Sequence, residues 1–247
     1  LLQAFGMIPP GCVLVVAQKQ LLAASASGFY DPETQELVVE GVEMNQLARV
    51  TLMHELLHAL QDQNFDLDRP ELDDRKDEID FGLSAVAEGD AKRMEEIWQA
   101  ELTDEERDQL AADNDEAAAM AQAMMQGVPP ALAAMLGAPY ELGLPMVGRL
   151  FDNGGQEAVD SLFFAPPDTS EQVIHDTKLV PREVRVDVAP PPADGPLVDD
   201  GVFGELATRL LIAPLVGQMT GERSGAGWGG DWRVSWKGGD DGETPCG

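Results

Sequence analysis

The chain has 247 residues, of which 45 are acidic and only 16 are basic, so its formal net charge is −29. This charge argues against nucleic acid as a partner, because phosphates would be repelled, and no run of about eighteen apolar residues predicts a membrane span. The length and an apolar content of 44% fit one large domain or two packed subdomains with a real core. The acidity itself fits either a salty habitat or a preference for basic substrates.

The first 45 residues predict a small β-containing subdomain. The run from Cys12 to Ala17 is apolar and reads as a strand, and residues 25–39 have the pattern of a hairpin that turns at Asp31-Pro32-Glu33-Thr34. The two cysteines, Cys12 and Cys246, stand near opposite ends of the chain. They fit one disulfide in an exported protein as well as they fit two unpaired thiols.

Residues 46–63 predict the helix that matters most for function. An amphipathic stripe recurs at three- and four-residue intervals, at Leu47, Val50, Thr51, His54, Leu57, His58 and Gln61. His54 and His58 lie one helical turn apart on this stripe, so both imidazoles can bind one zinc ion at about 2.0–2.1 Å. Glu55 lies beside them and can take a proton from a zinc-bound water, whose pKa the metal lowers to about 7. The pattern predicts a zinc hydrolase; two histidines buried in an ordinary core are the alternative.

A catalytic zinc site needs a third protein ligand and an open fourth position. No third histidine follows the motif closely, and His175 is the only other histidine in the chain. A carboxylate is therefore expected. The downstream candidates are Glu71, Glu78, Glu88, Glu95 and Glu96. We favour Glu88, because small residues one turn away would let its helix come close, whereas the first two candidates lie in a solvated acidic run.

The rest of the chain predicts mostly helices. The glutamate helix is expected from about Glu78 to Leu102, after an acidic loop at 66–80. Further helices are expected at residues 140–151 and, after the break at Gly154-Gly155, in a shorter segment that ends at Phe164. A short helix should begin at the capping-box pattern of residues 168–171, and another should span residues 203–216. A proline-rich acidic connector is expected over residues 181–201, and the alternation at 231–236 predicts a strand.

A hydrolase that cleaves a bond at a carbonyl carbon also needs a donor for the oxyanion that forms there. His175 should stand near the end of the short helix after residue 168, and it is our first candidate for this role. Tyr140 is the second.

Several segments together resemble the gluzincin-type neutral zinc metallopeptidases, in particular a bacterial branch of them. They cover most of the chain: Gly28-Phe29-Tyr30-Asp31-Pro32, His54 to Gln63, Ala87-Glu88-Gly89-Asp90-Ala91, Gly154-Gly155 with Ala158-Val159-Asp160, Pro166 to His175, and Gly227-Trp228-Gly229-Gly230-Asp231. The resemblance implies that His54, His58 and Glu88 bind zinc and that Glu55 is the general base. The interval from His58 to Glu88 is longer than in thermolysin-like members, so a different loop geometry is expected.

The resemblance also implies an α+β, zincin-like fold in a single catalytic domain over residues 1–247. Three parts would meet at a zinc cleft. They are a β-containing entry part at 1–45, the two site helices at 46–102, and a helical C-terminal subdomain at 103–247 with a glycine-rich tail strand. The strand at residues 28–30 would run along this cleft and pair with an extended substrate, or else be an edge that the protein itself covers. The expected activity is an endopeptidase acting on peptides or proteins, extracytoplasmic or secreted, with a prosegment or inhibitor as a further partner.

Two other classes of function stay open. One is a zinc-bound but proteolytically silent module that binds peptides or proteins on the same scaffold, and the other is a structural helical protein. Metal content separates the structural protein from the peptidase and the silent module, which both bind zinc. Hydrolysis of casein or gelatin then separates the peptidase from the silent module. Glu55 favours the enzyme, because a binding module has no need for a base at that position.

Overall fold

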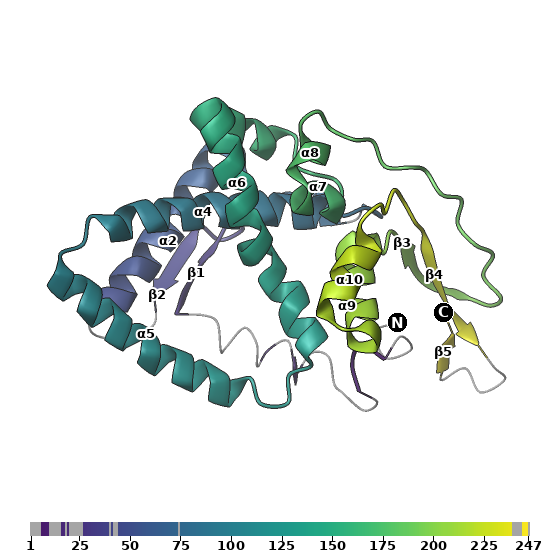
Figure 1. Ribbon diagram of the computed structural model, residues 1–247, viewed down its shortest axis with the longest axis horizontal. Helices are drawn as coiled ribbons and strands as arrows, with labels where there is room; N and C mark the ends of the chain where they lie inside the picture. Colours follow the sequence, from purple (N-terminus) through teal and green to yellow (C-terminus); the bar gives the residue numbers. More distant parts are fainter. Residues whose placement is uncertain are drawn as a thin grey trace.

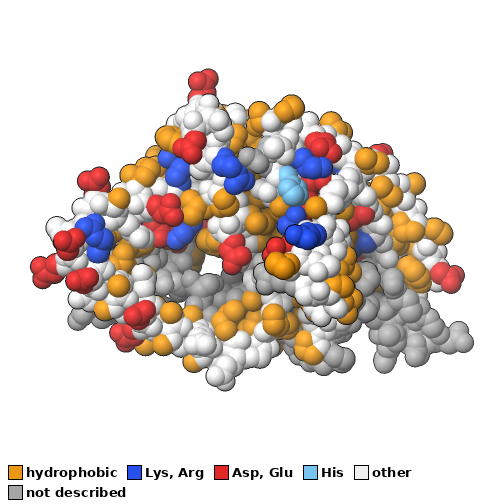
Figure 2. Space-filling view, in the orientation of Figure 1, with side chains coloured by type: hydrophobic (Ala, Val, Ile, Leu, Met, Phe, Trp, Pro, Cys, Tyr) orange, Lys and Arg blue, Asp and Glu red, His pale blue; other side chains and the backbone are white. Residues whose placement is uncertain are grey.

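A computed structural model describes residues 6–9, 16, 17, 19, 27–39, 41, 44–73, 75–238 and 244–246. The described part is mostly helical with two small antiparallel sheets, which confirms a broadly α+β composition. None of the described helices is both long and apolar enough to cross a bilayer. Figure 2 shows acidic side chains spread over the visible face rather than gathered in one patch.

The elements occur in the following order. They are β1 Gly28–Asp31, β2 Glu36–Val39, α2 Gln46–Phe65, α3 Pro70–Asp73, α4 Ile79–Ala100, α5 Asp104–Met124, α6 Pro130–Phe164, α7 Ser170–Ile174, α8 Asp176–Leu179, β3 Leu197–Gly201, α9 Gly204–Val216, α10 Gln218–Gly225, β4 Arg233–Gly238 and β5 Thr244–Cys246. In Figure 1, α2, α4, α5 and α6 surround the β1–β2 hairpin, while α9, α10 and the second sheet lie at the other end.

The predicted hairpin is confirmed. β1 pairs antiparallel with β2, with Gly28 opposite Val39, and the turn falls at residues 32–35. The hairpin packs on α2, where the Tyr30 hydroxyl donates to Asp62 Oδ2 at 2.8 Å. A Cβ on Gly28 would lie 2.7 Å from the Thr51 methyl group, so glycine lets β1 come this close to α2.

The strand expected from Cys12 to Ala17 is wrong where it can be compared, because Val16 and Ala17 are helical. Its other residues lie outside the described ones. The choice between a Cys12–Cys246 disulfide and two unpaired thiols also falls outside the described residues, since the first cysteine is not among them and the side chain of the second is not described. An apolar run of this length does not distinguish a strand from a buried helical turn.

The two site helices form where the sequence predicts them. The Asn45 side chain caps α2 by accepting from the Ala48 backbone N–H at 2.8 Å, and α2 continues to Phe65, slightly past the expected end at Gln63. α4 spans most of the predicted range from Glu78 to Leu102. The acidic loop between them contains one short helix, α3.

α4 and α6 cross with their backbones almost in contact. A Cβ on Gly143 would lie 2.1 Å from the Ala85 carbonyl oxygen, and a Cβ on Gly89 would lie 2.4 Å from the Gly143 carbonyl carbon. Next to this crossing, Ala85, Val86, Met146, Val147 and Phe163 are fully buried in the main core cluster. The crossing fixes the distance between the two helices, because no larger residue fits at either glycine.

Replacing Gly143 with alanine should therefore destabilise the protein by about 1–3 kcal/mol, because the new methyl group must push a backbone carbonyl away. Urea unfolding of the metal-free protein measures this change. Gly148→Ala is the matched control on the same helix, since a Cβ there meets nothing within 4 Å. Equal stability of the two variants would show that the crossing is not tight.

α6 consists of two helices that meet at a kink, as the sequence predicts. Non-helical backbone angles at Gly155, where φ is 66°, separate the helix expected at 140–151 from the shorter helix up to Phe164, and the first of the two begins earlier than expected, at Pro130. Proline suits the first turn because the backbone N–H that it lacks would have no helical partner there. Glycine adopts the positive φ of Gly155 without strain, so the glycine pair separates the two helices as predicted.

Two of the described strands in the C-terminal region, β3 and β5, were not expected. Residues 197–201, assigned to the connector, form β3, which pairs antiparallel with β4, and β4 pairs with β5. The predicted strand over 231–236 is largely confirmed as β4, and the short helix after residue 168 is confirmed as α7, with Thr169 as its cap. A strand as acidic as β3 forms because of its distant partner rather than its own sequence.

Candidate metal centre

α2 and α4 bring His54, His58 and Glu88 together. The two Nε2 atoms are 3.1 Å apart, and Glu88 Oε2 lies 3.2 Å from His54 Nε2 and 3.4 Å from His58 Nε2. Two ligand atoms at about 2.05 Å from a tetrahedral zinc ion are about 3.3 Å apart. The three atoms therefore have the spacing of three corners of such a tetrahedron, and the group could hold a metal ion.

The other ring nitrogen of each histidine faces an acceptor oxygen. His58 Nδ1 lies 2.9 Å from Gln61 Oε1, and His54 Nδ1 lies 3.3 Å from Glu95 Oε2. The second contact has the distance of an ion pair without the alignment of a good hydrogen bond. An acceptor at Nδ1 assigns the proton to that nitrogen and leaves the Nε2 lone pair for a metal.

Charges in the centre favour a cation. Burial works against the imidazolium form of His54, but the carboxylates of Glu88 and Glu95 outweigh it and raise the pKa of His54 to about 9. Burial would raise the pKa of Glu88, yet its contacts with the two histidines lower it to about 2. In the metal-free protein, the proton on the His54 imidazole thus supplies positive charge that a metal ion would bring.

Glu55 is beside the three ligands and is only 8% exposed. Burial raises the pKa of its carboxyl group, and the neighbouring histidines oppose this shift. The carboxylate accepts a hydrogen bond from the backbone N–H of Tyr30 in β1. This contact fixes the acid at the point where the hairpin meets α2.

An open cleft of about 380 Å³ lies next to this centre. Its walls come from β1, α2, α4, α5 and α6, and they include Gly28, Thr51, His54, Glu55, Lys92, Glu95, Asn114 and Tyr140. The Tyr140 ring lies 6.4 Å from the His54 ring, and its hydroxyl donates to Glu88. Burial, followed by the charge of Glu88, raises the pKa of Tyr140, so the phenol stays protonated and able to donate.

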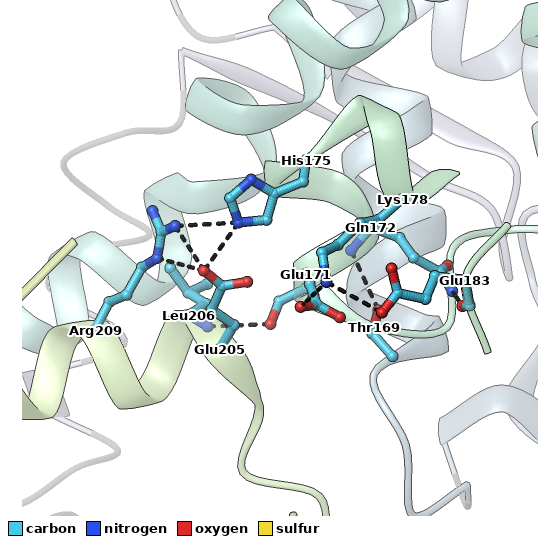
Figure 3. A network of polar contacts seen from close by, with 10 residues as sticks. Thr169, Glu171, Gln172, His175, Lys178, Glu183, Glu205, Leu206 and Arg209 are labelled. Carbon is cyan, nitrogen blue, oxygen red and sulfur yellow. Dashed lines mark hydrogen bonds and ion pairs between the residues drawn. The ribbon is translucent and has the colours of Figure 1, made fainter. Parts of the chain in front are cut away.

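The structure does not bring His175 to this cleft. His175 ends α7, and its Nε2 lies 3.1 Å from Glu205 Oε1 and 3.3 Å from Arg209 Nη2, both on α9 (Figure 3). Glu205 is fully buried. His175 is not among the residues that line the cleft, so of the two candidate donors only Tyr140 lies beside the metal group.

Sequence reasoning did not assign a role to the side chains that orient the histidines. Glu95 was considered only as a ligand, although it lies seven residues after Glu88 and therefore on the same face of α4. Gln61 was recognised only as part of the inward stripe. Both positions carry a periodic signal, but nothing local distinguishes an orienting side chain from a packed one.

No family model, no curated protein and no solved structure matches this chain. The functional case therefore depends on the residues and on their geometry.

Proposed function

We propose that this chain is a zinc-dependent metallopeptidase of the gluzincin type, with a zincin-like fold. The observation that carries the proposal is the triangle of His54, His58 and Glu88 with the buried Glu55 beside it, at one wall of an open cleft. Two imidazoles and one carboxylate are a ligand set of catalytic zinc sites in hydrolases, where the fourth position is left to water or substrate.

Zinc bound to these three residues would lower the pKa of a bound water and polarise the scissile carbonyl. Glu55 would accept the proton of that water and deliver it to the leaving amine. Tyr140 would donate a hydrogen bond to the oxyanion, a role supported by its raised pKa and its position in the cleft wall.

β1 supports a role in binding an extended peptide. In the described part of the chain, β1 has β2 as its only strand neighbour, and Gly28 lines the cleft beside Glu55. A substrate strand can pair with the free edge of β1 through backbone hydrogen bonds, which are independent of substrate sequence. We therefore propose peptides or proteins as substrates. From the resemblance of the sequence to gluzincin-type metallopeptidases, we also propose an extracytoplasmic or secreted location.

Tyr140→Phe tests the oxyanion donor. We expect turnover to fall by about 100-fold, because one oxyanion donor contributes about 10²–10³ in kcat, while the zinc content stays at one ion per chain. Steady-state kinetics with zinc analysis measures both. His175→Ala should leave turnover within a few-fold of the unmodified chain; a larger loss there than in Tyr140→Phe would reverse the assignment.

Metal removal tests the proposed function. The zinc-loaded protein should hydrolyse casein, lose this activity with a chelator such as 1,10-phenanthroline, and regain it when zinc is returned. Stoichiometric zinc without hydrolysis of casein or gelatin would instead support the silent binding module. Absence of zinc binding would leave the structural protein.

A further inference from the structure

His58 is held by a side chain whose own orientation is fixed. Gln61 Oε1 faces His58 Nδ1 at 2.9 Å, and Gln61 Nε2 donates to the Ala87 carbonyl oxygen and to Asp90 Oδ2, each at 3.1 Å. Gln61 is 3% exposed and Asp90 is 6% exposed. Because both contacts of the amide nitrogen are acceptors, the nitrogen must face them and the oxygen must face His58.

Arg93 completes this chain of contacts. Its Nη2 donates to Asp90 Oδ1 at 3.0 Å and to Gln156 Oε1 at 2.6 Å, and its guanidinium lies 4.1 Å above the Phe151 ring. Arg93 is 8% exposed, and its buried Nε has no hydrogen-bond partner. Gln156 and Phe151 are on either side of the bend of α6 at Gly155, so the chain of contacts runs from α6 to a metal ligand.

The orientation of the Gln61 amide decides which nitrogen of His58 can bind a metal. With the oxygen at Nδ1, the ring carries its proton there and presents the Nε2 lone pair. If the amide turned over, its NH₂ group would require Nδ1 to accept, the proton would move to Nε2, and the ring could no longer bind a metal through that atom. Asp90 prevents this turn, and Arg93 supplies the charge without which a buried carboxylate is costly.

We propose that Arg93, acting through Asp90 and Gln61, is a positioning residue that fixes the tautomer of His58 for metal binding and links α6 to the metal centre. The proposal relies on the metal-binding part of the proposed function and not on hydrolysis. It assigns His54 a separate support, Glu95, whose Oε1 is held by Lys92 at 2.7 Å and by Gln99 at 2.9 Å.

Zinc affinity, measured by competition with a chromophoric chelator, tests this proposal. Gln61→Leu and Arg93→Met should each weaken zinc binding by about 10- to 100-fold, the usual cost of losing an outer partner of a ligand. Gln63→Leu, at an exposed position of the same helix, should leave the affinity unchanged. Affinities in Gln61→Leu and Arg93→Met equal to that of the control would overturn the proposal.

A double-mutant cycle distinguishes an effect transmitted through the Arg93–Asp90–Gln61–His58 contacts from a general loss of stability. Gln61→Leu and Arg93→Met together should weaken zinc binding little more than either alone, because both act through one bond to His58. Arg93→Met combined with Glu95→Gln should instead multiply the two losses. Multiplied losses in the first pair would contradict the proposed order of contacts.

A metal-free measurement guards against variants that do not fold. ¹⁵N NMR of the histidine rings should show His58 protonated at Nδ1 in the unmodified chain and a mixture of tautomers in Gln61→Leu, which creates no unpaired charge. An unchanged tautomer in Gln61→Leu would overturn the proposal even if Arg93→Met unfolds.

Normal zinc binding without hydrolysis would overturn only the proposed function, and absence of zinc binding would overturn both.

Discussion

Glu55→Gln is expected to retain one zinc ion per chain and to lose peptide hydrolysis. Glutamine has nearly the same shape and can still accept the Tyr30 N–H, so β1 and α2 should stay in place. It cannot take a proton from water, and general-base catalysis contributes about 10²–10⁴ in rate. We therefore expect kcat on casein or an unstructured peptide to fall by about 10³-fold, measured beside zinc content.

Glu96→Gln is the control for this substitution, because Glu96 is exposed and lies outside the cleft. Its activity should equal that of the unmodified chain. Full activity in Glu55→Gln would remove Glu55 from the mechanism. Loss of zinc from Glu55→Gln would instead mean that this side chain supports the metal itself.

Glu88→Gln is expected to weaken zinc binding strongly and, with it, hydrolysis. Glu88 Oε2 is the third corner of the ligand triangle, and a neutral amide replaces its negative charge with little change in volume. The zinc affinity should fall by more than the roughly 10- to 100-fold that loss of an outer partner costs. Equilibrium dialysis followed by metal analysis measures this change, and added zinc should restore only part of the activity.

Substitutions at neighbouring glutamates define what Glu88 contributes. Glu96→Gln should bind zinc normally, whereas Glu95→Gln should show the smaller loss expected of a residue that only orients His54. Undiminished zinc affinity in Glu88→Gln would show that another residue supplies the third ligand.

Local patterns account for the part of the site that the sequence predicts. The four-residue interval between His54 and His58 places both rings on one face of α2, whatever surrounds the helix. The small residues around Glu88 predict a closely packed neighbour on the side of the histidine helix, but the helix that the structure shows packed against Ala85 and Gly89 is α6. The hairpin is predictable because its turn residues stand between two runs of strand-forming side chains.

Contacts between distant segments account for what the sequence does not predict. Tyr140 reaches Glu88 because α6 crosses α4 at Gly143, and nothing near Tyr140 in the sequence specifies that crossing. His175 has the chemistry of an oxyanion donor, but its contacts are with Glu205 and Arg209 on α9. β3 likewise depends on β4, which follows it by a long stretch of chain.

The most direct test of the zinc centre is X-ray absorption at the zinc edge of the zinc-loaded protein, together with metal stoichiometry. The account predicts one zinc per chain, with nitrogen and oxygen ligands at about 2.0–2.1 Å and the scattering of two imidazoles. Absence of bound zinc, or sulfur ligands at about 2.3 Å, would contradict the assignment of His54, His58 and Glu88 as the site.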